Sequence, residues 1–240
     1  MSPLLAAHDV VRSFGSTRAL DGASLAIDAG EVVAIMGPSG SGKSTLLHCL
    51  AGILTPDAGS VRFDGRELTA MGDRERSALR RRDFGFVFQF GQLVPELDCR
   101  ENAALPLRLE GVRRREAERR AVAWLGRLEV AELARKRPGE ISGGQGQRVA
   151  VARALAAEPR VLFADEPTGA LDSLNGERVM ELLTAAARDH GTAVVLVTHE
   201  PRVAAYADRE EIVRDGRTRA AEPGGAARAA EPQLSGSGRR

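Results

Sequence analysis

Nine residues at positions 37–45, GPSGSGKST, constrain this chain more than any other stretch. They match the pattern G-x-x-x-x-G-K-[ST] in full and directly follow the apolar run VVAIM at 32–36. Such a loop needs a buried strand before it and a helix after it, so that backbone N–H groups surround an anion at the helix N-terminus. The following STLLHCLAG suits that helix, and Gly52 can end it. The stretch therefore predicts an α/β fold.

The same nine residues predict that a nucleoside triphosphate binds here. Lys43 can reach the β- and γ-phosphates, and Ser44 can hold Mg²⁺. Only two of the 34 basic residues are lysines, and one of them is Lys43, where a slim point charge fits better than a planar guanidinium. A plain glycine turn that caps a helix is the simpler alternative. The predicted contact residues are Gly37, Pro38, Ser39, Gly40, Ser41, Gly42, Lys43, Ser44 and Thr45.

Short apolar runs predict a mostly parallel sheet, since continuous rather than alternating hydrophobicity suits strands covered on both faces. The predicted strands lie at 32–36, 84–89, 161–165 and 193–198.

The N-terminal stretches are also short but are separated by turn signals, so they predict an antiparallel patch beside this sheet. These stretches are 4–14, 23–28 and 60–68.

A segment of about 91–155 reads as mostly helical, and we expect a helical subdomain inserted into the core. RRREAERRAVAWLGRLEVAELARK places four apolar residues along one face. These are Val122, Leu125, Leu128 and Leu133. Beyond position 218 the sequence RAAEPGGAARAAEPQLSGSGRR is poor in apolar residues, which predicts a disordered tail at 219–240 after a single domain at 1–218.

Composition excludes several classes of function. The net charge of +1 argues against broad electrostatic binding to nucleic acid or to anionic lipid. No apolar run reaches the roughly 18 residues of a membrane span, and the N-terminus lacks the pattern of a secretory signal. Cys49 and Cys99 form no disulfide or metal-binding pattern. We therefore expect a cytoplasmic location.

VLFADEP at 161–167 supplies a second part of the predicted site. A buried strand delivers Asp165 at its carboxyl end, where α/β sheets bind ligands, and this carboxylate suits Mg²⁺. Glu166 is the candidate to polarise an attacking water. On its own, such an acidic pair is also typical of a helix cap or a surface pair.

ISGGQGQRVAVARAL at 141–155 carries a second serine–glycine turn that opens a second helix. An ordinary N-cap is the simpler interpretation, but a helix N-terminus is again suited to an anion. One triphosphate has little use for two such loops in one chain. The predicted contact residues of this second loop are Ser142, Gly143, Gly144 and Gln145.

This second loop resembles the signature motif of ABC ATPases, and the whole chain from 4 to about 217 follows that family's order. Phe14 matches the aromatic residue that stacks on adenine, and Gln89 matches a glutamine that touches Mg²⁺ and senses the partner. GALD at 169–172 matches the loop before the dimer contact, and His199 matches the switch histidine. Taken singly, Phe14 and His199 are more typical of packing residues.

The resemblance implies a P-loop NTPase core and a head-to-tail homodimer that holds two ATP molecules. Ser142–Gln145 of one chain then cap the γ-phosphate bound by the other, while Ser44, Gln89 and Asp165 hold Mg²⁺. Lys43, Glu166 and His199 are the implied catalytic residues. Gly146 and Ile141 depart from the family's usual glutamine and leucine, but neither change removes a phosphate donor.

The stretch FGQLVPELDCRENAALPLRLEG at 90–111 resembles the lipoprotein-release and macrolide-exporter ATPases. That resemblance implies a separate membrane permease as partner, and export or extraction of a peptide, lipoprotein or drug-like substrate. It also implies a peripheral position at the cytoplasmic side of the membrane. Two alternatives stay open from the residues: a soluble ABC-type ATPase acting on DNA or ribosomes, and a P-loop kinase or GTPase.

Overall fold

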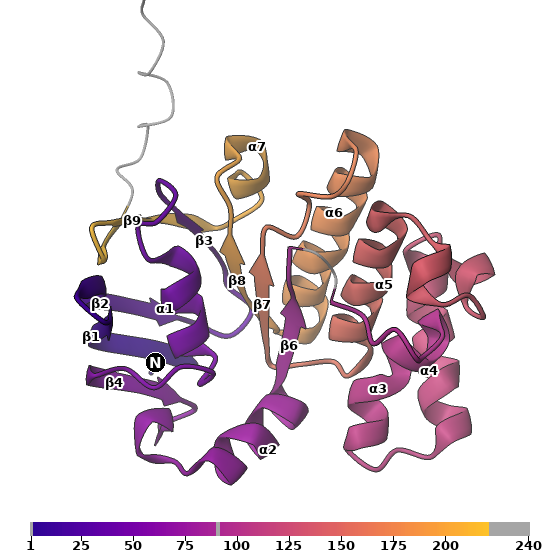
Figure 1. The fold of residues 1–240 in the computed structure, drawn as a ribbon, viewed down its shortest axis with the longest axis horizontal. Coiled ribbons are helices and arrows are strands. Elements are labelled where there is room, and N and C mark those ends of the chain that lie inside the picture. Colours follow the sequence, from indigo (N-terminus) through magenta and orange to yellow (C-terminus); the bar gives the residue numbers. More distant parts are fainter. Residues whose placement is uncertain (1, 90–91, 221–240) are drawn as a thin grey trace, which may run out of the picture.

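The larger of two sheets carries the predicted parallel core. The computed structural model describes residues 2–89 and 92–220 and arranges six strands in the order β10-β9-β3-β8-β7-β6 (Figure 1). All neighbours are parallel except β10, which forms an antiparallel hairpin with β9 at the edge. The strands are β3 (Val32–Met36), β6 (Phe84–Val87), β7 (Val161–Asp165), β8 (Ala193–Val197), β9 (Arg209–Arg214) and β10 (Arg217–Ala220).

The smaller sheet is the predicted antiparallel patch, in the order β2-β1-β4-β5. Its second strand is longer than the sequence pattern indicated, because residues from Thr17 onward pair with the end of the first strand, where Phe14 faces Thr17. The strands are β1 (Leu5–Phe14), β2 (Thr17–Ile27), β4 (Ala58–Phe63) and β5 (Arg66–Glu67).

Alternate side chains of the parallel sheet enter two separate hydrophobic cores. Val33 and Ile35 of β3 face a core shared with helix α1 and the smaller sheet, whereas Ala34 faces a core shared with α5 and α6. Both faces of the sheet are therefore covered, which explains the continuous hydrophobicity of its strands. The helices that cover it are α1 (Lys43–Leu50), α5 (Gly143–Ala156) and α6 (Ser173–His190).

The helical subdomain lies to one side of the sheet (Figure 1) and is built from helices α3 and α4 against α5. Within the predicted long helical stretch, α4 ends at Arg127, and Leu128 and Leu133 are buried in the following turns. Val122 was expected on the buried face, but this was wrong: its side chain is 39% exposed. The buried residues of α4 are Ala117, Ala121, Trp124 and Leu125, and Val122 lies off that row.

The remaining elements connect these layers. They are α2 (Asp73–Asp83), α3 (Cys99–Leu109), α4 (Arg114–Arg127), α7 (Pro201–Ala204) and the short 3-10 turns at Leu68–Ala70, Ala131–Leu133 and Pro138–Glu140. Strand β10 extends two residues past the predicted boundary at 218. The rest of the predicted tail lies outside the described residues. None of the helices in the described ranges combines the length and apolarity needed to cross a bilayer.

Candidate nucleotide-binding site

Two glycines shape the loop between β3 and α1. Gly37 has a φ of 143°, and a Cβ added to it would lie 2.1 Å from the carbonyl oxygen of Val213. Gly42 has a φ of 106°, and its added Cβ would lie 2.3 Å from the carbonyl oxygen of Ala19. Any side chain at either position would therefore force the loop out of this shape. The G-x-x-x-x-G spacing is a steric requirement of this fold.

The N-terminus of α1 is open to an anion. Its N-cap, Gly42, offers no side chain, and the first turn contains no acidic residue. The hydroxyl of Ser41 is buried and has no hydrogen-bond partner among the described residues. Lys43 Nζ donates to the carbonyl oxygens of Gly37, at 2.9 Å, and Pro38, at 2.8 Å, so the ammonium lies over the loop. The sequence expectation of a cradle for phosphate oxygens fits this geometry.

Asp165 and Glu166 follow one another at the carboxyl end of β7. Asp165 pairs with Val197 in the neighbouring strand β8, and the backbone N–H of Glu166 donates to the Val197 carbonyl at 2.9 Å. Glu166 has a φ of 48°, which is uncommon for a residue with a side chain and recurs at functional sites. Because β3 and β7 flank β8 in a parallel sheet, these carboxylates and the phosphate loop lie at the same edge.

Glu166 is bound by two side chains from the end of β8. His199 Nδ1 donates to Glu166 Oε1 at 2.6 Å, since a carboxylate can only accept, and Thr198 Oγ1 donates to Oε2 at 3.3 Å. The hydrogen bond that His199 donates to Glu166, together with the negative charge of that carboxylate, raises the pKa of His199 above its usual value. The histidine is 70% exposed, so it can be reached from outside the chain. The sequence placed both residues in the site but did not predict that they touch.

Gln89 and Phe14 lie at the ends of strands, and both are exposed. Gln89 follows β6, and a Cβ on Gly169 would lie 3.9 Å from its Cγ, so it lies beside the loop that follows Glu166. Phe14 ends β1 with 48% of its surface exposed, and the guanidinium of Arg12 lies 5.1 Å from the ring centroid. An exposed ring is available for stacking, and this role stays a prediction.

The second predicted loop caps its own helix. Ser142 Oγ accepts from the N–H of Gln145 at 3.3 Å, and Gln145 Oε1 accepts from the N–H of Ser142 at 2.9 Å. The two glycines between them differ in how much space surrounds them. A Cβ on Gly143 would meet nothing within 4 Å, whereas one on Gly144 would lie 3.2 Å from the carbonyl oxygen of Ala170. Gly144 is thus needed by the chain's own packing.

The two loops lead into helices on opposite faces of the parallel sheet. Leu46 and Leu47 of α1 belong to one core, and Val149 and Val151 of α5 belong to the other. Figure 1 shows α1 and α5 on either side of the central strands. No hydrogen bond within the described ranges joins 142–145 to the phosphate loop. The chain brings together its phosphate loop, Asp165, Glu166 and His199, and leaves its second loop apart from them.

Sequence reasoning missed Gln147 and Asn102, two buried amides near these loops. Gln147 is 1% exposed and donates to the carbonyls of Phe88 and Pro167. Asn102 is fully buried, and its side chain accepts from Val94 N–H and donates to three carbonyls, so it fixes the segment before α3. A polar residue within a run of buried helical positions was the available signal in both cases.

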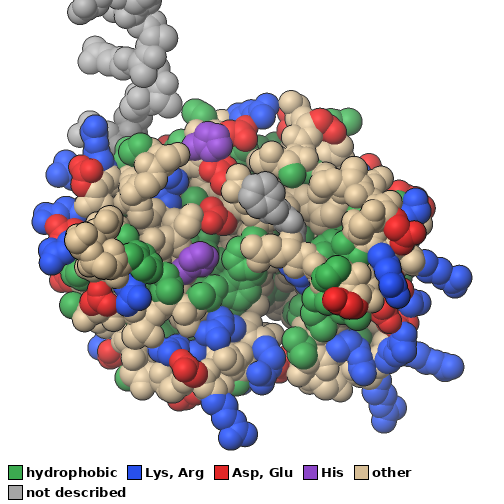
Figure 2. Space-filling view, viewed as in Figure 1, with side chains coloured by type: hydrophobic (Ala, Val, Ile, Leu, Met, Phe, Trp, Pro, Cys, Tyr) green, Lys and Arg blue, Asp and Glu red, His purple; other side chains and the backbone are tan. Residues whose placement is uncertain are grey.

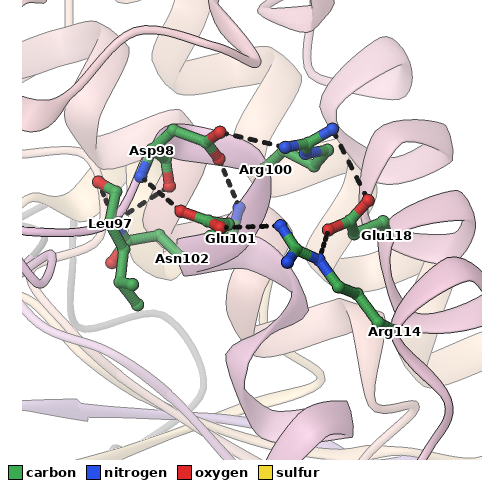
Figure 3. Close-up of polar contacts among 7 residues, drawn as sticks. All are labelled: Leu97, Asp98, Arg100, Glu101, Asn102, Arg114 and Glu118. Atoms are coloured by element: carbon green, nitrogen blue, oxygen red, sulfur yellow. Dashed lines mark hydrogen bonds and ion pairs between the residues drawn. The ribbon is translucent and has the colours of Figure 1, made fainter.

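Figure 3 shows how this segment is joined to α4. Asp98 caps α3 in a reciprocal pair with Glu101, and Arg100 links Asp98 to Glu118 of α4. Arg114 binds both Glu101, at 3.1 Å, and Glu118, at 2.6 Å. The start of α3 is therefore fixed to α4 by charged contacts.

Asp172, the last residue of the GALD loop, is the N-cap of α6. It accepts from Asn175 N–H at 2.9 Å and from Asn175 Nδ2 at 2.7 Å, and the backbone hydrogen bond from Asn175 contributes most to lowering the pKa of Asp172. Since the carboxylate stays ionised, it holds the loop to the start of α6. The GALD loop thus joins Glu166 to a rigid helix.

Comparison with known proteins agrees with this arrangement. A phosphate loop and two carboxylates at one edge of a parallel sheet define a P-loop NTPase, and the family model "ABC transporter" matches residues 20–169. The lipoprotein-releasing system ATP-binding protein LolD of Paramagnetospirillum magneticum is 48% identical over 82% of this chain and 87% of its own. The macrolide export ATP-binding/permease protein MacB of Marinobacter nauticus is 45% identical over 89% of this chain but 34% of its own.

A solved structure is also similar over nearly the whole chain. The ATP-binding cassette MJ0796, in a dimeric post-hydrolysis state bound to ADP and Pi, has a TM-score of 0.85 and 39% identity, and covers 91% of this chain and 98% of its own. The chain belongs to the ABC transporter family and is an ATPase of that family. The expected resemblance to lipoprotein-release and macrolide-exporter ATPases is confirmed. These relatives do not favour a soluble ATPase acting on DNA or ribosomes.

Proposed function

We propose that this chain energises a transporter by hydrolysing ATP between two copies of itself, with the residue roles expected from the sequence. One observation carries the proposal: an open phosphate loop lies at the same sheet edge as Asp165 and Glu166. In this proposal the N–H groups of 37–45 and the Lys43 ammonium bind the β- and γ-phosphates. Phe14 stacks on the base.

Glu166 acts as the general base in this proposal. It lies one residue beyond Asp165, and His199 and Thr198 hold its two oxygens. On binding of ATP, His199 turns from Glu166 to the γ-phosphate, and the freed carboxylate orients the attacking water and accepts its proton. The exposed position of His199 leaves room for that movement.

Mg²⁺ fits the donors present at this edge. The hydroxyl of Ser44, the carboxylate of Asp165 and the amide oxygen of Gln89 are all hard oxygen donors, which Mg²⁺ prefers. Within residues 2–89 and 92–220, no cluster of three or more His, Cys, Asp or Glu side chains forms a metal cage. That agrees with a cation bound jointly by few protein groups and the phosphates. When bound, the ion neutralises charge on the phosphates.

A homodimer completes the site. Because the 142–145 turn and the phosphate loop lead into helices on opposite faces of one sheet, a single chain does not bring both to one phosphate. Two chains placed head to tail do so twice. Ser142, Gly143 and Gln145 of one chain then lie over the γ-phosphate held by the other.

The proposed permease contact is a groove between the core and the helical subdomain. Figure 2 shows the molecule hollowed between α2 and α3, and the groove there has a volume of about 510 Å³. Phe86, Phe88 and Leu105 line it, and the exposed Ile53 and Leu109 border it. Such an apolar, open groove suits a helix from a membrane subunit.

The choice of a permease as occupant is supported by the similar MacB, whose name describes ATP-binding and permease parts in one protein. By this proposal the chain is peripheral to the cytoplasmic side of the membrane. Its cargo is a lipoprotein, peptide or drug-like molecule, as the names of LolD and MacB suggest.

The decisive experiment is Glu166→Gln, which keeps the shape of the side chain and removes most of its basicity. Turnover falls by on the order of 10²–10⁴-fold, while ATP still binds. Because ATP then persists between the chains, size-exclusion chromatography with Mg-ATP shows a longer-lived dimer than for the parent chain. Glu132→Gln, an exposed position in the helical subdomain, is the matched control. A Glu166→Gln variant that stays monomeric and hydrolyses ATP at the parent's rate removes Glu166 from the mechanism.

A further inference from the structure

The side chain of Gln147 joins three parts of the molecule that the proposed mechanism uses separately. It belongs to α5, five residues after Ser142, and its Nε2 donates to the carbonyl of Phe88 at 3.0 Å and to the carbonyl of Pro167 at 3.0 Å. Phe88 immediately precedes Gln89, and Pro167 immediately follows Glu166. One amide group thus holds the backbone beside both residues.

A primary amide suits the chemistry of this position. Two carbonyl oxygens face one atom, and the –NH₂ group of glutamine supplies two donors from that atom. The side chain is 1% exposed, so water does not replace a lost donor. A glutamate here offers only acceptors when ionised, and a methionine of similar length offers no donor.

The acceptor end of the same amide is the second observation. Gln147 Oε1 is buried and has no partner in the described part of the chain. An unpartnered buried oxygen is unfavourable, and an apolar side chain would avoid it. The amide thus stands here at a cost to folding, which agrees with a role for its two donors.

The two carbonyls lie in loops whose shape matters for hydrolysis. Glu166 holds an uncommon φ of 48°, and its own carbonyl accepts from Gly169 N–H at 3.1 Å, so the turn after it is tight. The Cγ of Gln89 lies near that turn. One turn of α5 before Gln147, Gly144 lies against Ala170 of the same loop. α5 therefore contacts this loop at two successive turns.

We propose that Gln147 is a positioning residue for ATP hydrolysis, which sets Gln89 and Glu166 in register with the helix that carries the second loop. When Ser142–Gln145 dock on the partner's nucleotide, any movement of α5 reaches the chain's own Glu166 and Gln89 through this amide. The inference rests on the proposed roles of Glu166 and Gln89. Gln147 acts in this proposal through the backbone at Phe88 and Pro167.

The test compares Gln147→Met with Thr192→Val in the full chain. Thr192 is also buried, and its hydroxyl donates to the Pro159 carbonyl at 2.8 Å at the opposite, amino end of β7 and β8. Both substitutions remove buried donors to carbonyls, so both lower stability. ATP hydrolysis is measured at a temperature at which circular dichroism shows both variants fully folded.

Gln147→Met is expected to lower kcat by about 10–100-fold, as a small misplacement of catalytic groups does, and to leave KM for ATP within about 3-fold, because the phosphate loop is untouched. Thr192→Val leaves both constants within about 2-fold. A kcat of Gln147→Met equal to that of Thr192→Val overturns the proposal, as does a loss confined to KM. If Gln147→Met does not fold, Gln147→Asn, whose amide is one methylene too short, is judged by the same outcomes.

Glu166→Gln, assayed in parallel, separates this inference from the proposed function. If Glu166→Gln retains the parent's turnover, the proposed function fails whatever Gln147 does. If Glu166→Gln loses turnover and Gln147→Met does not, the inference about Gln147 alone fails.

Discussion

The phosphate loop at 37–45 and the turn at 141–147 both lead into a helix N-terminus, but they differ in whether side chains cap that terminus. At α1 the N-cap is Gly42, without a side chain, and the buried Ser41 hydroxyl finds no partner among the described residues. At α5, Ser142 and Gln145 satisfy each other's backbone N–H groups. The first terminus has no side-chain cap, whereas the second caps the N–H groups of Ser142 and Gln145.

This difference agrees with the proposal that the phosphate loop binds ATP in a single chain. Unsatisfied N–H groups favour an anion at the phosphate loop in a single chain. The cap of the second loop uses the N–H groups of Ser142 and Gln145 and leaves those of Gly143 and Gly144 for the phosphate that a partner chain presents in the proposed dimer. In that proposal the phosphate loop binds ATP in the single chain, and the second loop binds it only in the dimer.

The largest effect is expected from a substitution in the phosphate loop, on the affinity for ATP. Lys43→Ala is predicted to weaken ATP binding by about 10²-fold or more, because hydrogen bonds from a charged donor to phosphate are lost.

Ser142→Arg, in contrast, is expected to leave ATP binding by each isolated chain within about 2-fold but to block hydrolysis, since the bulky cation lies where the partner's γ-phosphate must dock. A fluorescent ATP analogue and a phosphate-release assay measure the two effects.

Mixed dimers of Lys43→Ala and Ser142→Arg test whether the two loops contribute to the same ATP site. A head-to-tail pair of this kind has one site with both lesions and one site with neither. The mixture is therefore expected to hydrolyse ATP faster than either variant alone. Equal rates in the mixture and in the separate variants, with mixed dimers shown to form, would contradict the composite site.

A smaller effect concerns the self-made cap of α5. Ser142→Ala removes the acceptor for Gln145 N–H and is expected to lower the free energy of unfolding by about 1 kcal/mol. Ser39→Ala, in the exposed part of the phosphate loop, changes it by less than about 0.5 kcal/mol, because no helix cap is lost. Urea denaturation of both variants gives the two values. Equal urea midpoints for the two variants would mean that the cap of α5 adds nothing to stability.

The smallest expected effect is a pH dependence at His199. Glu166 raises the pKa of His199 in the folded chain, with a smaller contribution from Glu200 and opposition from Lys43. The contact therefore stabilises the fold fully below the ordinary pKa of 6.5, and this stabilisation is lost as pH rises through the raised pKa. The high exposure of His199 keeps the effect small.

His199→Ala is expected to lower the urea midpoint more at about pH 5.5 than at about pH 9. A second substitution, His190→Ala at the far end of α6, serves as the control for histidine titration in general. If His199→Ala lowers the midpoint equally at both values, the ion pair with Glu166 is not formed in solution.

Several elements could be predicted from the sequence because their rules are local. The strands at 32–36 and 161–165 match the apolar runs residue for residue, since both sheet faces are covered. The start of α5 at Ser142 followed from the serine before two glycines. The expectation for Val122 was wrong because this residue lies within α4 but off the row of residues that the helix buries.

The phosphate loop, the order of the motifs and the class of protein could be predicted without a structure, because each motif is a short run of consecutive residues. Which motifs share an edge or a face depends on how the chain folds in three dimensions. The fold placed Glu166 against His199, 33 positions away. It also brought Gln147 to Phe88 and Pro167, 59 and 20 positions away. Such contacts form because helices pack on the sheet in three dimensions, and a buried amide must then find its partners wherever that packing places them.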